Sequence, residues 1–382
     1  MSFPPAARVP VGLAALFIGL NAFFGGNSGP DFTPCTIGTP EAKLAGCSAL
    51  IDRGDLKGRN LSIAYLQRGL VYGEQNDLDA ALSDYTAAIE ADPKHALAYS
   101  NRAHTYGRLG HLAHAHADLD AAQKLDPKLA IVYQNKTFIY SLEGKVEAAL
   151  AAAETAVGLA PRDPRNHYNI GALKALQGDS ASALAAYDKS IEIDPSYADS
   201  YVNSGVLLAD KGDFDGAIAR YRKALEIAPE NALAYHNLGF AYGRRNEWQP
   251  ALEATARAIA LDPASKQSYL VRALARANLG DIEGAIADNT AAIGLDASFM
   301  VAYVNRAEVR MIKGQHQAAI ADCTQAILLE PATEDLGYIH ALRGQAYAKI
   351  GETMKARADF EKALALTPGE KIAAEGLASL GS

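Results

Sequence analysis

Two consecutive stretches of the sequence decide its fold. They are residues 198–231, ADSYVNSGVLLADKGDFDGAIARYRKALEIAPEN, and residues 232–265, ALAYHNLGFAYGRRNEWQPALEATARAIALDPAS. Aligned without a gap, both carry Tyr at position 4, Asn at 6, Gly at 8, Ala at 20 and Pro at 32. The same spacing of 34 residues separates the prolines at 93, 127, 161, 195, 229 and 263. A fixed period of this length predicts an array of repeated units rather than a single globular core.

The period defines nine units. They cover 62–95, 96–129, 130–163, 164–197, 198–231, 232–265, 266–299, 300–333 and 337–370. The seventh unit has Ala297 in place of the proline, and the ninth follows a three-residue insertion. Position 20 is Ala in every unit, position 8 is small, position 4 is Tyr or His, and position 15 is Gly or Asn.

This pattern predicts a helical hairpin in each unit. Positions 4, 8 and 11 share one face of a first helix, and positions 20, 24 and 27 share one face of a second. Small residues at 8, 20 and 27 allow the two helices to approach closely. Gly or Asn at 15 ends the first helix in a left-handed conformation, and Pro at 32 ends the second. One hairpin cannot bury its apolar face alone, so neighbouring units stack.

The pattern resembles the tetratricopeptide repeat family over residues 62–370. The resemblance implies an all-α fold, a right-handed α-solenoid of about nine hairpins with a concave face lined by the first helices. Some positions depart from the family pattern: Lys174, Arg276 and Arg310 replace the aromatic at position 11, and Thr255 and Asn289 occupy position 24. There we expect looser local packing. Trp248 falls at a core position, and Cys323 is expected to be a buried free thiol.

Position 7 is basic in six units, and five of those six carry Asp at position 23, as in Arg68 with Asp84. The three units without a basic residue at position 7, the fourth to the sixth, also lack that Asp. This covariation favours an ion pair between two helices, either within one unit or between neighbours, and it sets units four to six apart.

The ends of the array predict caps and export. Residues 40–61 contain a lone helix of the second type and a connection, and 371–382 form a capping helix of the first type. Residues 1–28, with an apolar run at 9–24, fit a secretory signal peptide or a membrane anchor, followed by a linker at 29–39. Export would place Cys35 and Cys47 in an oxidising compartment, where we expect a disulfide. The protein is therefore expected to be periplasmic or secreted, or tethered to the inner membrane.

Composition excludes several functions. The 382 residues carry 36 Lys and Arg against 44 Asp and Glu, a net charge of −8, which argues against nucleic-acid binding. The sequence shows no recognisable catalytic triad, phosphate loop or zinc motif, so we expect no enzyme activity, cofactor or metal. The histidines at 111, 114 and 116 are expected to be solvated side chains rather than a metal site.

We therefore predict a non-catalytic scaffold that binds an extended protein segment in its concave groove. Position 6 supplies a ladder of asparagine amides, expected to point into the groove, and position 9 adds apolar side chains. The predicted peptide-binding residues are Asn101, Asn135, Asn169, Asn203, Asn237, Asn305, Val206 and Phe240. The alternative is a cell-envelope assembly component that docks through its convex face or its ends. An enzyme or metal-dependent module is the third class.

Overall fold

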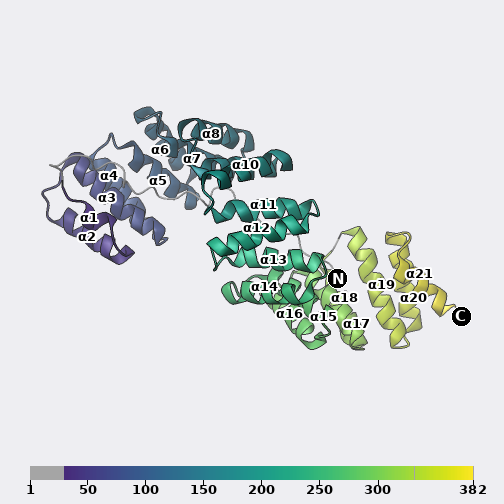
Figure 1. Cartoon of the computed structure of the whole chain (residues 1–382). Helices are drawn as coiled ribbons and strands as arrows, with labels where there is room; N and C mark the ends of the chain where they lie inside the picture. The colour runs from purple at the N-terminus through teal and green to yellow at the C-terminus, as the bar shows by residue number, and fades with distance from the viewer. Residues whose placement is uncertain (1–29, 331, 382) are drawn as a thin grey trace. The chain divides into compact units, whose positions relative to one another are not determined.

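The computed structural model describes residues 30–330 and 332–381, and they are helical with no strand among them. The predicted signal or anchor at 1–28 lies outside these residues. The described part divides into two compact bodies, one ending at Ser200 and the other starting at Tyr201, and each is treated by itself. Within each body, successive helices pack as hairpins, which Figure 1 shows in chain order.

Each of the nine units forms two helices. The first helices are α3 Gly58–Glu74, α5 Ala96–Arg108, α7 Ala130–Leu142, α9 Pro164–Leu176, α11 Ala198–Asp210, α13 Ala232–Arg244, α15 Lys266–Asn278, α17 Met300–Ile312 and α19 Thr333–Lys349. The second helices are α4 Leu78–Ala91, α6 Leu112–Leu125, α8 Val146–Leu159, α10 Ser180–Ile193, α12 Phe214–Ile227, α14 Trp248–Leu261, α16 Ile282–Leu295, α18 His316–Leu328 and α20 Thr353–Leu366. The insertion before the ninth unit lengthens α19 at its start.

The residues that define the repeat do what the pattern predicts. All nine alanines at position 20 have no exposed surface, which confirms them as helix contacts. All nine residues at position 15 have a positive φ, including Asn76 at 63° and Asn246 at 61°. Left-handed backbone at this place ends the first helix and starts the turn.

The volumes at positions 8 and 24 compensate each other within a unit. A Cβ added to Gly205 would lie 2.6 Å from the ring of Tyr221, so only glycine fits opposite that tyrosine. Gly69, Gly171 and Gly344 face Tyr85, Tyr187 and Phe360 in the same way. Where position 8 carries a methyl group, position 24 is smaller, as in Ala307 with Cys323, which is the predicted buried free thiol.

In the five units that carry both residues, the charged pair at positions 7 and 23 forms inside the unit and not between neighbours. The Arg68 guanidinium donates two hydrogen bonds to Asp84, both of 2.8 Å, and Arg102, Arg272, Arg306 and Arg343 bind their aspartates alike. The hydrogen bonds to Asp84 raise the pKa of the Arg68 guanidinium. Two parallel bonds to one carboxylate fix geometry as well as charge.

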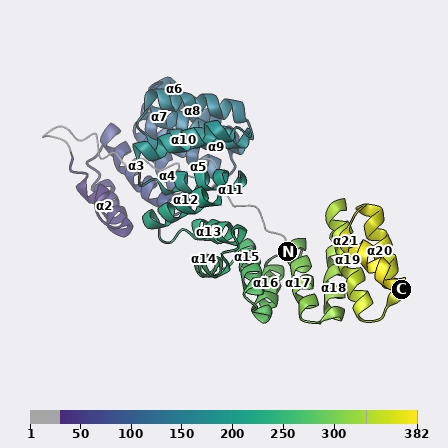
Figure 2. The same cartoon turned by 45° about the vertical axis from the view of Figure 1, so that its right-hand side comes forward.

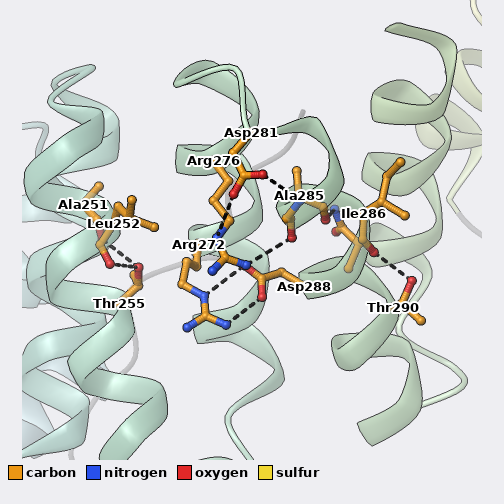
Figure 3. A network of polar contacts seen from close by, with 12 residues as sticks. Ala251, Leu252, Thr255, Arg272, Arg276, Asp281, Ala285, Ile286, Asp288 and Thr290 are labelled. Carbon is orange, nitrogen blue, oxygen red and sulfur yellow. Dashed lines mark hydrogen bonds and ion pairs between the residues drawn. The ribbon is translucent and has the colours of Figure 1, made fainter. Parts of the chain in front are cut away.

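The sequence suggested looser packing around the arginines at position 11. The structure shows instead that these arginines make additional contacts. Arg276 donates to Asp288 at 3.0 Å and to the Gly284 carbonyl at 3.2 Å, so Asp288 receives both Arg272 and Arg276 (Figure 3). Arg310 repeats this arrangement on Asp322. The long guanidinium arm takes the place of an aromatic ring and satisfies the buried carboxylate. Thr255 and Asn289, at position 24, each donate to a carbonyl four residues earlier in their own helix.

Additional helices cover both ends of the array. At the front, α2 Pro40–Asp52 packs on α3 as a second-type helix, and Ser48 accepts a hydrogen bond from Arg68. A short helix, α1 Thr33–Thr36, lies inside the stretch expected to be a linker, and the structure joins Cys35 to Cys47 in a disulfide. At the back, α21 Lys371–Leu380 packs on α19 and α20. Among the described residues, no helix has the length and apolarity needed to cross a membrane.

Candidate peptide-binding site

The asparagines at position 6 lie in the seams between helices and not on an open groove surface. Asn101, Asn135 and Asn237 are 2%, 1% and 0% exposed, and Asn169, Asn203 and Asn305 are also buried. The expectation that these amides project into the groove is therefore wrong. A helical wheel gives the direction of a side chain from its own hairpin, but the first helix of the neighbouring unit covers that direction.

Asn135 shows what this burial does. Its Nδ2 donates to the backbone carbonyl and to the hydroxyl of Ser100, both at 2.9 Å, and so links α7 to α5. Val271 and Leu342 occupy position 6 in later units and are just as buried. The seam therefore accepts either an apolar side chain or an amide that bonds to the preceding first helix.

Several amides in the N-terminal body are incompletely paired. Gln67 and Asn101 each have a side-chain nitrogen with no hydrogen-bond partner, and Asn135 and Asn169 each have such an oxygen. These four residues occupy position 6 of the first four units in succession. Buried polar groups are nearly always paired, so four unpaired atoms at one repeat position need a physical reason.

The apolar side chains at position 9 pack inside the body. Val206 and Phe240 belong to one core cluster with Tyr221 and Tyr242, and neither offers an open surface. In the N-terminal body, the rings of His104 and Phe138, both at position 9, are 4.8 Å apart between α5 and α7. The predicted apolar strip is thus part of the contact between successive first helices.

A second polar seam runs beside the first, and the sequence reading missed it. Gln134, at position 5, donates to Asn166 of the next unit at 2.7 Å and to Asp163, the last residue of its own unit, at 2.8 Å. In the C-terminal body, His236 at position 5 meets Ser268 at 3.1 Å. Paired polar residues at position 5 of one unit and position 3 of the next are the signal that could have found this seam.

A free thiol and three neighbouring histidines are the groups that suggest chemistry. Burial raises the pKa of the Cys323 thiol to about 12, which keeps it protonated and unreactive. His111 and His114 are exposed, while His116 is paired with Glu143 at 3.1 Å. The described residues hold no cluster of three or more His, Cys, Asp or Glu side chains suited to a metal ion.

Models of one repeat family match several stretches of the array. Models described as "Tetratricopeptide repeat" match residues 143–198, 186–219, 96–129, 301–333 and 338–370, and one described as "TPR repeat" matches 64–110 and 205–246. The chain belongs to the tetratricopeptide repeat family. Repeats of this family form protein-interaction scaffolds, and the tetratricopeptide fold is generally non-catalytic.

A solved structure shows the same fold over most of this chain. The Cut9–Hcn1 hetero-tetramer of the APC/C is 16% identical with a TM-score of 0.51, over 90% of this chain and 83% of that chain. A tetratricopeptide repeat protein from Parabacteroides merdae ATCC 43184 is 20% identical with a TM-score of 0.48, and the match covers 66% of this chain and 99% of that chain. MamA is 28% identical with a TM-score of 0.40, and the match covers 42% of this chain and 94% of that chain. No curated protein matches the sequence.

Proposed function

We propose that this tetratricopeptide array holds an extended segment of a partner protein along its first helices, using the amides at position 6. One observation carries the proposal: Gln67, Asn101, Asn135 and Asn169 are buried, and each keeps one side-chain polar atom unpaired. An unsatisfied buried polar atom costs about 1–3 kcal/mol. A ligand that pairs all four atoms would offset that cost in four successive units, less the two hydrogen bonds to Ser100 that Asn135 gives up when it turns to the ligand.

The chemistry of a peptide backbone suits this arrangement. Each peptide group offers one donor and one acceptor, and the four amides offer unpaired nitrogens and unpaired oxygens. Neighbouring first helices pack about 10 Å apart, and an extended chain rises about 3.3 Å per residue. One amide would then meet about every third residue of the ligand. Because the amides are buried, the ligand reaches them only after their side chains rotate out of the seams.

The test replaces three of these amides with leucine, giving the N101L/N135L/N169L variant. Leucine is a fair substitute because Leu342 already fills position 6 of the ninth unit. We expect the folded variant to lose capture of a crosslinked partner that the wild type retains. The matched control is Asn60→Leu, an exposed asparagine of α3, which should capture the partner normally. Full capture by the folded triple variant would favour docking through the convex face or the ends.

We also propose that the protein is exported. The apolar run at 9–24 supports this, together with the paired Cys35 and Cys47, since a disulfide persists in an oxidising compartment. Residues 1–40 fused to a reporter that is active only outside the cytoplasm should give signal. A stably expressed but silent fusion would contradict export.

A further inference from the structure

A hollow of about 390 Å³ lies at the C-terminal end of the array, between α19 and α21. Figure 2 shows α19, α20 and α21 as neighbours at this end. Phe360, Ile372 and Leu380 provide apolar walls, and Gln345, Lys349 and Glu375 provide polar ones. The volume lies within the range of about 300–1,000 Å³ that is typical of ligand pockets.

The repeat register explains why the array is open here. With Lys371 at position 1, α21 continues the first-helix pattern and places Gly376 at position 6 and Ser379 at position 9. Every earlier unit has a larger side chain than glycine at position 6, and eight of the nine have a larger side chain than serine at position 9. A Cβ on Gly376 would lie 2.3 Å from Cζ of Phe360, so no larger residue fits at that place. The Phe360 ring therefore occupies the space beside Gly376, and the short side chain of Ser379 lines the hollow that stays open.

Two opposite charges flank this hollow. Lys349 on α19 and Glu375 on α21 are both exposed, and in the described part of the chain neither has an ion-pair partner. The hollow therefore has an apolar floor with a positive charge on one side and a negative charge on the other. A peptide segment fits this arrangement if it has an apolar side chain with an acidic residue on one side and a basic residue on the other.

We propose that this hollow, which we call the C-terminal pocket, binds one aliphatic side chain of an extended partner segment flanked by one acidic and one basic residue. The acidic residue pairs with Lys349 and the basic residue pairs with Glu375. The proposal rests on the proposed function, because it assumes that the first helices hold an extended segment. It adds a sequence preference to recognition that otherwise reads only the backbone.

The test uses the full chain and short fluorescein-labelled peptides with Gly-Ser flanks, measured by fluorescence polarisation. The central sequences are Glu-Leu-Lys, Glu-Ala-Lys, Lys-Leu-Lys and Glu-Leu-Glu. The wild type should bind Glu-Leu-Lys about tenfold more tightly than Glu-Ala-Lys, because leucine buries three more carbons. Each wrongly charged flank should weaken binding about twofold to fivefold. Absence of binding, or equal affinity for all four peptides, would overturn the proposal.

Charge-swap variants sharpen the test, because their prediction holds for either direction of the peptide. Lys349→Glu should change the preferred peptide to Lys-Leu-Lys, and Glu375→Lys should change it to Glu-Leu-Glu. An unchanged preference in both variants would contradict the assigned pairs.

A further pair of variants tests the pocket itself. Ser379→Leu fills the pocket and should weaken binding of Glu-Leu-Lys about tenfold. Ala378→Leu is the matched control, since Ala378 is exposed on α21 but does not line the pocket. Equal binding by these two folded variants would refute the site.

The two proposals can fail separately. The N101L/N135L/N169L variant changes only the N-terminal body, so intact Glu-Leu-Lys binding with lost partner capture would leave the pocket standing. Normal capture by Ser379→Leu, together with unselective peptide binding, would remove the pocket and keep the ladder.

Discussion

At the scale of single residues, one arginine at position 7 joins three helices. Arg102 binds Asp118 of its own unit and donates from Nη1 to Thr86 of the preceding unit at 3.1 Å. Hydroxyls at position 25 have this role in three units, where Thr86, Thr290 and Thr324 accept from the arginine of the next unit. Ser48 of the capping helix α2 accepts from Arg68 in the same way. In the third unit, Lys136 instead reaches Asp120, which also stands at position 25. The ion pair is thus internal to a unit, while its cation also links neighbours.

Arg272 is the exception, because Ala256 stands at position 25 of the unit before it. We expect Ala256→Thr to supply the missing acceptor and raise the free energy of unfolding by about 0.5–1.5 kcal/mol. Ala256→Val is the control, since valine has the same shape without the hydroxyl. Urea unfolding followed by circular dichroism measures the difference. Equal stabilisation by threonine and valine would show that packing, and not the hydrogen bond, is responsible.

Buried histidines give the protein a predictable pH dependence. Burial lowers the pKa of His95 and His236 to about 4 and that of His104 to about 3, against an ordinary value of 6.5. These histidines therefore bind protons below about pH 6.5 in the unfolded chain, but only below about pH 4 in the folded chain. Stability is fully present above pH 6.5 and falls by up to about 1.4 kcal/mol per pH unit for each such histidine.

We therefore expect the midpoint of thermal unfolding to fall between pH 7 and pH 5, and to fall less steeply in His236→Gln. His111→Gln, at an exposed site, should retain the full slope. Thermal melts at pH 7, 6 and 5 compare the three proteins. A slope unchanged by His236→Gln would show that this imidazole is protonated in the folded state as readily as in the unfolded one.

At the scale of the helix pair, positions 8 and 24 share one volume. Gly205→Ala places a methyl group 2.6 Å from the Tyr221 ring and should cost about 1–3 kcal/mol. The Ala103 and Leu119 pair of the second unit shows that a methyl at position 8 is compatible with leucine at position 24. Gly205→Ala combined with Tyr221→Leu should therefore cost less than the sum of the two single changes. A double-mutant cycle by denaturant unfolding measures this coupling, and strict additivity would contradict it.

Local features of the hairpin could be predicted from the sequence, and contacts between units could not. Position 15 needs a left-handed residue and position 20 needs a small one, whatever surrounds the hairpin. The fate of Asn135 depends instead on how closely α5 lies beside α7, which no periodicity in a single unit reveals. Arg276 has another reason: its partner Asp288 lies in the same hairpin, but the family pattern at position 11 predicts an aromatic ring and gives no sign that a guanidinium reaches position 23. The four-residue α1 is too short to show a helical period.

At the scale of the whole chain, the array works as a series of neighbour contacts whose strength varies along its length. Asp322 illustrates a strong local dependence, because its carboxylate, like that of Asp288, holds two arginines and is almost completely buried. Removing one partner of a buried ion pair leaves uncompensated charge, at a cost of about 3–5 kcal/mol. In a repeat array, such damage passes first to the adjoining units.

Asp322→Ala should therefore open the C-terminal units without disturbing the first ones. Arg306 would lose its carboxylate, and its link to Thr290 of the seventh unit would weaken as well. Hydrogen exchange followed by mass spectrometry should show faster exchange in α15–α20 and unchanged exchange in α3–α6. Asp120→Ala is the control, because Asp120 is 63% exposed and its pair with Lys136 is worth at most about 1 kcal/mol. Equal acceleration in every helix would mean that the chain opens as one cooperative unit, and the nearest-neighbour account would then be wrong.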